Sequence, residues 1–188
     1  MLTVWPWRGI LAALFMCSAA VSGSAEEACE REMARAAQIY GVPLGVLYAV
    51  GLAETGRAGS LRPYALNVEG KAVYDIGKDE ALHTVVAARR TGARMIDIGC
   101  MQINHHFHGH MFNSIEDMLD PARNVDYAAR FLKELRAREG SWTLAVARYH
   151  AGPDNDPAQK KYVCRVIANL AASGFGAWTP QARSFCRP

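Results

Sequence analysis

Helix start and stop signals recur along most of this sequence, and they constrain its fold more than any other feature. Asp120-Pro121 and Asp156-Pro157 each place a potential N-capping aspartate before a proline suited to the first helical turn. Gly41, Gly92 and Gly140 follow stretches with helical spacing and mark helix ends. The pattern predicts helices over residues 26–40, 43–55, 79–91, 121–139, 142–149 and 157–172.

The periodicity changes between the second and third of these helices. Residues 64–68 and 71–74 flank a Glu69-Gly70 turn and predict a β-hairpin, to which a short strand near residues 95–98 is expected to add. We therefore expect a mainly α (α+β) chain, with one domain over residues 26–172. Residues 173–188 are expected to form a tail that packs on this domain and is held by Cys186.

The first 25 residues have the composition of a secretory signal peptide. Arg8 supplies the positive charge, residues 9–21 are apolar, and Gly23-Ser24-Ala25 offers small residues for cleavage. The apolar run is shorter than the ~20 residues of a membrane span, although an uncleaved anchor is the alternative. Export to the periplasm is therefore predicted. A lipid anchor on Cys17 is disfavoured, because Phe15 and Met16 stand where small residues are needed.

The cysteine count supports an oxidising compartment. Removal of the leader takes away Cys17 and leaves an even set, which in an exported chain predicts two disulfides with three possible pairings. The spacing contains no Cys-x-x-Cys, which argues against a zinc ribbon or a thioredoxin-type site. The remaining cysteines are Cys29, Cys100, Cys164 and Cys186.

Glu54 is the first candidate for chemistry. Leu47, Val50 and Gly51 precede it at three- and four-residue steps, so the carboxylate continues an apolar helix face. Desolvation of an unpaired carboxylate raises its pKa, and such a group at the mouth of a cleft suits general acid catalysis at neutral pH. The plainer alternative is a surface glutamate at a fraying helix end.

Two further segments carry polar residues in unusual settings. In the first, over residues 97–104, Gly99 permits a close backbone approach, and Gln102 and Asn104 are able to hydrogen-bond a polar ligand. In the second, over residues 147–153, Tyr149 stands at a helix end where its hydroxyl is able to enter a cleft. Alone, each segment is equally compatible with an ordinary turn or helix end.

In this order, the three segments resemble the catalytic domain of soluble lytic transglycosylases, which is related to goose-type lysozyme. That family carries Glu-Ser at a helix end, then Gly-Leu-Met-Gln, then Ala-Tyr-Asn-x-Gly. The corresponding residues of this chain are Glu54-Thr55, Gly99-Cys100-Met101-Gln102 and Arg148-Tyr149-His150-Ala151-Gly152. The resemblance spans about residues 28–172 and implies a lysozyme-like fold. Three positions depart from the pattern: Thr55 for serine, Cys100 for leucine and His150 for asparagine.

The resemblance implies cleavage of peptidoglycan between N-acetylmuramic acid and N-acetylglucosamine, with 1,6-anhydromuramyl ends as product and no cofactor. Glu54 would act as acid and then base, and Tyr149 would hydrogen-bond near it or near the acetamido group. The implied substrate-binding residues are Gly99, Met101, Gln102, Ile103, Asn104 and His150.

Two other functions stay open. A hydrolytic muramidase of the same fold needs a second carboxylate, for which Asp97 is the nearest candidate. A non-catalytic wall-binding module of a secretion, pilus or flagellar assembly is the other, although the presence of Glu54 argues against it. Insertions like the one between Glu54 and Gly99 occur in transglycosylases that accompany secretion, pilus or flagellar machines. This analogy leaves a partner of that kind open and does not identify a machine.

Charged residues outside these segments are given plainer interpretations. The formal net charge of +3 argues against a dedicated nucleic-acid binder. His105, His106, His108 and His110 are expected to be polar loop residues, although on a strand His106, His108 and His110 would share one face. A metal site is the alternative, which the lack of a nearby Cys or carboxylate cluster disfavours, and contact with sugar or pH sensing also stays open. Arg89, Arg90 and Arg94 are interpreted as a solvated face that is able to meet anionic wall polymers.

Overall fold

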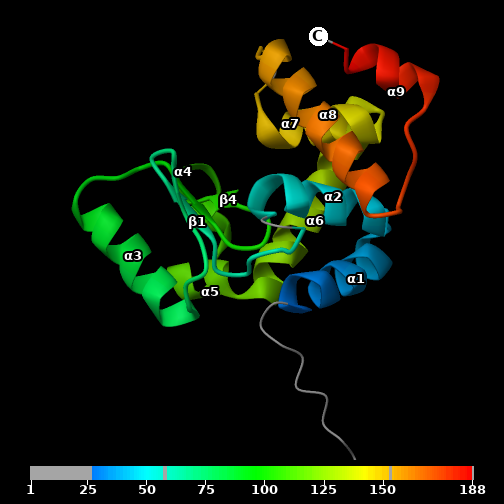
Figure 1. The fold of residues 1–188 in the computed structure, drawn as a ribbon. Coiled ribbons are helices and arrows are strands. Elements are labelled where there is room, and N and C mark those ends of the chain that lie inside the picture. Colours follow the sequence, from blue (N-terminus) through cyan, green and yellow to red (C-terminus); the bar gives the residue numbers. More distant parts are fainter. Residues whose placement is uncertain (1–26, 57–58, 153, 188) are drawn as a thin grey trace, which may run out of the picture.

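The computed structural model describes residues 27–56, 59–152 and 154–187, and they form helices around a small sheet. The predicted mainly α class with a β-hairpin is confirmed. Figure 1 shows the strands with α3 and α4 on one side of α6, and α7, α8 and α9 on the other. The helices are α1 Ala28–Tyr40, α2 Leu44–Thr55, α3 Lys78–Arg90, α4 His105–His108, α5 Ile115–Leu119, α6 Pro121–Glu139, α7 Trp142–His150, α8 Asp156–Ala172 and α9 Pro180–Phe185.

Side-chain caps fix where several of these helices begin. The Asp120 carboxylate accepts the backbone N–H of Arg123 at the start of α6, as the Asp-Pro signal predicts. Ser141 caps α7 in the same way. At α8 the prediction is off by one residue: Asn155 is the cap and accepts from Ala158, which places Asp156 in the first turn. Its negative charge there still favours the positive helix end.

The sheet is antiparallel, with the order β2-β1-β3-β4. The predicted hairpin consists of β1 Leu66–Val68 and β2 Lys71–Val73, and β3 Ile96–Ile98 pairs with β1 on the other side. A fourth strand, β4 Ile103–Asn104, adds to β3 through the tight turn at residues 99–102.

The histidine-rich segment differs from its prediction as a loop with a shared strand face. Residues 105–108 form the short helix α4, and a 3₁₀ turn, η2 Gly109–Met111, follows it. The physical reason is the cap: the Asn104 side-chain oxygen accepts the backbone N–H groups of His106 and Phe107. His106, His108 and His110 therefore do not line up on one strand face.

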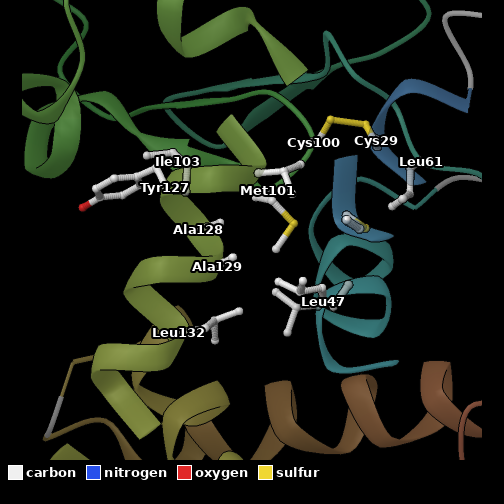
Figure 2. Close-up of a cluster of buried hydrophobic side chains, with 14 of the residues drawn as sticks. Cys29, Leu47, Leu61, Cys100, Met101, Ile103, Tyr127, Ala128, Ala129 and Leu132 are labelled. Carbon is white, nitrogen blue, oxygen red and sulfur yellow. A yellow bond between two sulfur atoms is a disulfide. The ribbon is translucent and has the colours of Figure 1, made fainter. Parts of the chain in front are cut away.

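The core forms where α1, α2 and α6 meet the segment that joins β3 to β4. Met101 has none of its surface exposed and points between α6 and α2, among Leu47, Ala128 and Leu132 (Figure 2). Tight contact with α2 depends on Gly51, because a Cβ added there would lie 2.5 Å from Met33 and 3.1 Å from Leu61. The core therefore holds α2 and the β3–β4 segment in a fixed relation.

Two disulfides select one of the three possible pairings. Cys29–Cys100 joins α1 to the β3–β4 segment, and both residues are fully buried (Figure 2). Cys164–Cys186 joins α8 to the end of α9. Lys160 also donates a hydrogen bond to the Arg187 carbonyl at 3.0 Å.

Residues 173–187 include α9, which the sequence analysis did not predict. Phe175 packs on Tyr48 with ring centroids 5.6 Å apart. No helix in the described ranges is long and apolar enough to cross a membrane. The predicted signal peptide and Cys17 lie outside the described residues.

Candidate active site

A cleft of about 760 Å³ opens between the helices and the sheet. We call its two sides the helical wall, contributed by α2, α7 and α8, and the sheet wall, contributed mainly by the strands and α4. The helical wall includes Leu52, Ala53, Glu54, Tyr149, His150, Arg165 and Asn169. The sheet wall includes Asn67, Tyr74, Met95, Asp97, Gln102, Ile103, Asn104, Phe107 and His108.

Glu54 lies in the last turn of α2, a helix that is apolar almost throughout. Its side chain is 15% exposed and lines the cleft. The Tyr162 hydroxyl donates a hydrogen bond to Glu54 Oε1 at 2.5 Å. No other described group donates one to this carboxylate, so Oε2 is left without a donor among the described residues.

Tyr162 is one residue of the site that the sequence analysis missed. It lies on the buried face of α8 with Val163 and Val166, so the sequence pattern gives it the appearance of a core aromatic. Burial, followed by the nearby charge of Glu54 and its hydrogen bond, raises the pKa of Tyr162 well above the usual value for tyrosine. The phenol therefore stays protonated and remains a hydrogen-bond donor to Glu54 at neutral pH.

His150 completes a small cluster with these two residues. Its ring stacks on Tyr162, with centroids 4.1 Å apart and planes 2° from parallel. His150 Nδ1 lies 3.8 Å from Glu54 Oε1, and its side chain is 38% exposed to the cleft. Because the stack fixes the phenol from one side, His150 and Tyr162 together restrict the position of the Glu54 carboxylate.

Thr55 connects the end of α2 to the β3–β4 segment. It is fully buried, and its hydroxyl oxygen lies 3.2 Å from the Gly51 carbonyl and 3.3 Å from the Cys100 carbonyl. The same oxygen accepts the Arg62 N–H at 3.5 Å. Thr55, which stands where the family pattern has serine, therefore retains the hydroxyl that makes these hydrogen bonds.

Asp97 and Asn104 face each other across β3 and β4. Asn104 Nδ2 donates to Asp97 Oδ1 at 2.7 Å, and the Asn104 side-chain oxygen caps α4. Burial raises the pKa of the Asp97 carboxyl above its usual value, the Asn104 hydrogen bond opposes this, and the charge of Glu54 adds to it. Both residues line the cleft. Both polar side-chain atoms of Asn104 already bond within the sheet wall, as does Oδ1 of Asp97.

Gln102 occupies the turn before β4 with a positive φ of 45°. Its side-chain nitrogen donates to the carbonyls of Ala65 and Gly99 at 2.9 and 3.0 Å. The amide oxygen makes no hydrogen bond with a described residue and remains able to accept one from a ligand. Ile103, beside it, also lines the cleft, although only 3% of its surface is exposed.

Gly99 and Met101 are buried and are not among the residues that line the cleft. Gly99 has a φ of 81°, and a Cβ added to it would lie 2.7 Å from Asn124 Nδ2, so the close neighbour that requires glycine is Asn124 and not a ligand. The Met101 side chain belongs to the core for the packing reasons given above.

Asn124 is a second residue that sequence reasoning missed. It is 1% exposed, donates to the carbonyls of Ile98 and Met118 at 2.9 Å each, and accepts the Met101 N–H at 2.9 Å. A buried asparagine with three hydrogen bonds holds the backbone of the β3–β4 segment to α6. Helical spacing could have found it, because Asn124 lies four residues before Ala128 and so continues the buried face of Ala128 and Leu132.

Tyr149, at the end of α7, lines the cleft and donates its hydroxyl proton to the Met101 carbonyl at 2.8 Å. Burial, with the charge of Glu54 adding to it, raises the pKa of Tyr149 well above its usual value. Since a phenol has one proton to donate, that proton holds the β3–β4 segment instead of bonding to Glu54.

Within the described ranges, no three His, Cys, Asp or Glu side chains are grouped so that they could hold a metal ion. His108 Nδ1 lies 2.7 Å from the Tyr127 hydroxyl, and burial lowers the pKa of this histidine.

Comparison with known families gives one result. The family model described as "Transglycosylase SLT domain" matches residues 32–169, a range that contains Glu54, the β3–β4 segment, Tyr149 and Tyr162. Searches of curated proteins and of solved structures found no match.

Proposed function

The chain belongs to the transglycosylase SLT domain family, and from this we propose that it cuts the β-1,4 bond between N-acetylmuramic acid and N-acetylglucosamine in peptidoglycan. The observation that carries the proposal is the setting of Glu54. It is a mostly buried carboxylate at a polar cleft, with one oxygen bonded to Tyr162 and the other without a donor among the described residues.

In the proposed first step, Glu54 carries a proton and transfers it to the glycosidic oxygen. The bond from that oxygen to the anomeric carbon of N-acetylmuramic acid breaks, and positive charge develops on the sugar. Tyr162 remains hydrogen-bonded to Oε1 throughout, so the carboxylate that forms keeps a donor. This hydrogen bond strengthens as charge develops on Glu54, and it therefore favours the transition state over the bound substrate.

In the proposed second step, the 6-hydroxyl of the same muramyl residue attacks the anomeric carbon. Its proton returns to Glu54, so the acid is regenerated and no water is consumed. The product is a 1,6-anhydromuramyl end. The internal nucleophile replaces the second carboxylate that most glycosidases use.

The proposed sugar contacts differ in kind between residues. The Gln102 amide oxygen and the exposed ring of His150 are available to hydroxyl and acetamido groups. Asn104 and Ile103 shape the subsite, since the polar atoms of Asn104 are used by Asp97 and α4. Gly99 and Met101 are proposed to act through the backbone position that they fix, and Tyr149 through its hydrogen bond to Met101.

Hydrolysis is the second candidate, because Asp97 lines the same cleft as Glu54. A hydrolase needs this carboxylate to hold the attacking water as a base. The raised pKa of Asp97 and its hydrogen bond from Asn104 do not prevent that role, but they leave only one of its oxygens uncommitted. We therefore rank transglycosylation first.

Mass spectrometry of the muropeptides released from purified peptidoglycan tests the proposal. The wild-type protein is expected to release 1,6-anhydromuramyl ends, and Glu54→Gln is expected to release none. Glu80→Gln, an exposed glutamate in the first turn of α3, is the matched control and should behave as wild type. Reducing ends would favour the hydrolase, and undiminished release by Glu54→Gln would overturn the catalytic assignment.

We also propose that the protein acts outside the cytoplasm, in the periplasm, where its substrate lies. The two disulfides support this, because such bonds form in oxidising compartments. The leader over residues 1–25, the single domain over residues 26–172 and the packed tail over residues 173–188 remain part of the proposal. Service to a secretion, pilus or flagellar machine stays a prediction.

A further inference from the structure

A second hollow, of about 350 Å³, lies outside the catalytic cleft. It is formed by the end of α3, the segment that leads to β3, and the start of α4. Its side chains are almost all cationic or able to become so, and none is acidic. The lining residues are Arg89, Gly92, Ala93, Arg94, His105 and His106.

Neither arginine of this hollow forms a salt bridge with a described residue, and both are exposed. Glu69 lies beside Arg94, and its Oε1 accepts the backbone N–H groups of Arg94 and Met95 at 2.7 and 3.0 Å. These hydrogen bonds, and then the charge of Arg94, lower the pKa of Glu69, so this carboxylate offsets part of the charge of Arg94. Elsewhere the arginines usually have carboxylate partners, as in Arg35–Glu32, Arg62–Asp75, Arg123–Asp117 and Arg130–Asp126.

The pKa of His105 is lowered in part by the positive charges around it. Burial lowers its pKa, and the charges of Arg89 and then His106 lower it further. Its ring is held in place because it packs against the backbone of Gly109, where an added Cβ would lie 3.2 Å from the ring. An anion in the hollow would offset the repulsion among these groups and accept hydrogen bonds from both guanidinium groups.

The hollow and the sheet wall of the cleft are lined by residues that follow one another in the chain. Met95 and Asn104 line the cleft, and their chain neighbours Arg94 and His105 line the hollow. The His106 ring meets Phe107 edge-on at 4.8 Å, and Phe107 is a cleft residue. The same short segments therefore bound both hollows, and a flexible group that branches from a glycan in the cleft has to pass around one of them to reach the second hollow.

We propose that this hollow is a subsite for the free carboxylates of the stem peptide that branches from a muramyl residue bound in the cleft. The proposal rests on the proposed function, since it takes peptidoglycan as the ligand. Arginine guanidinium groups bind carboxylates through paired hydrogen bonds, and the exposed position keeps them reachable. The subsite would select peptide-bearing strands over bare glycan.

The test compares the double variant Arg89→Gln/Arg94→Gln with Arg90→Gln. Arg90 is also exposed and follows Arg89 on α3, but it does not line the hollow, which makes it a matched control. With peptide-bearing glycan strands, the double variant is expected to raise KM about tenfold with little change in kcat. With strands stripped of their peptides by an amidase, all three proteins should have the same KM. Three results would overturn the proposal: an equal rise in KM on both substrates, an equal rise in KM for Arg90→Gln, or no rise in KM for the double variant.

A bead-binding assay separates this proposal from the catalytic one. Peptide-bearing and amidase-stripped glycan strands are immobilised on beads, and the bound fraction of wild-type protein and of the double variant is measured without any need for cleavage. Wild type should bind the peptide-bearing strands more tightly, and the double variant should lose that preference. If no protein cleaves glycan but this pattern holds, the subsite stands and the proposed function fails. If cleavage occurs and wild type binds both kinds of strand equally, the subsite fails alone.

Discussion

The two walls of the cleft use their polar side chains differently. On the helical wall, Tyr162 donates to Glu54, and His150 stacks on Tyr162, so both act on the proposed acid. On the sheet wall, Asp97 and Asn104 bond to each other. The Gln102 side chain bonds to backbone carbonyls. In the proposed mechanism the helical wall therefore sets the proton chemistry, whereas the polar groups of the sheet wall mainly hold its shape.

The segment that joins β3 to β4 couples the two walls. Thr55 from α2, Asn124 from α6 and Tyr149 from α7 all hydrogen-bond its backbone. The Cys29–Cys100 disulfide fixes it to α1 as well. A change in this segment should therefore move the sheet wall relative to Glu54, and a change within the helical wall should alter chemistry without moving either wall.

The largest effect is expected from removing the buried disulfide that anchors the sheet wall. Cys29→Ala/Cys100→Ala opens a loop with a sequence separation of 71, for which chain entropy predicts a loss of about 4 kcal/mol in the free energy of unfolding. Lost packing adds to this, since both residues are fully buried. Urea unfolding under non-reducing conditions measures it.

The second disulfide supplies the control for this prediction. Cys164→Ala/Cys186→Ala opens a loop with a separation of only 22, and chain entropy predicts about 3 kcal/mol. Its residues are half-buried and lie away from the cleft lining, so the KM for glycan should stay close to wild type. A greater loss of stability, or a greater rise in KM, in this variant than in Cys29→Ala/Cys100→Ala would contradict the proposed anchoring role.

A smaller effect, confined to chemistry, is expected from Tyr162→Phe on the helical wall. The variant keeps the ring that fills the core and stacks on His150, but it loses the hydrogen bond to Glu54. A hydrogen bond to a charged group is worth about 2 kcal/mol, so kcat should fall about thirtyfold while KM changes little. Steady-state kinetics on soluble glycan strands measures both constants.

Tyr40→Phe is the matched control for Tyr162→Phe. The Tyr40 hydroxyl also donates to a carboxylate, that of Asp126 at 2.7 Å, but neither residue lines the cleft. It should leave kcat unchanged. An equal fall in kcat for both tyrosines would mean that general destabilisation, and not contact with Glu54, explains the result.

The sequence predicted the elements whose signals are local. Asp120, Ser141 and the glycines after α1 and α6 act on neighbouring backbone groups, so six helices were placed to within two residues. The Glu69-Gly70 turn located the hairpin for the same reason. The position of Glu54 at the cleft followed from helical spacing and from the family resemblance together.

The rest depends on contacts between residues far apart in the chain. Tyr162 acts on Glu54 across 108 positions, and Asn124 reaches Met101 across 23, so neither partner is visible in a local pattern. Met101 and Gly99 were predicted to bind the ligand because the motif contains them. The structure gives another reason for these residue types: Met101 packs in the core against α2, and Gly99 lies against Asn124. Residues 105–108, which were expected in a loop, form a helix because Asn104 caps it. This cap uses the same side chain that was predicted to bind sugar.

The smallest effect on activity is expected from Asp97→Asn on the sheet wall. The amide oxygen can still accept the Asn104 hydrogen bond, so the shape of the wall is kept. If Glu54 works without a second carboxylate, kcat should change less than about threefold, whereas loss of a catalytic base costs roughly a hundredfold or more.

The same substitution should affect stability in a pH-dependent way. The raised pKa of Asp97 means that burial disfavours its charged form, so wild type loses stability from this group as the pH rises through that pKa. The variant cannot ionise at this position, and its stability relative to wild type should therefore rise as the pH rises above about 4, the ordinary pKa of aspartate. Urea unfolding at a series of pH values measures this. A hundredfold loss of kcat would assign the sheet wall a chemical role and remove the distinction between the two walls.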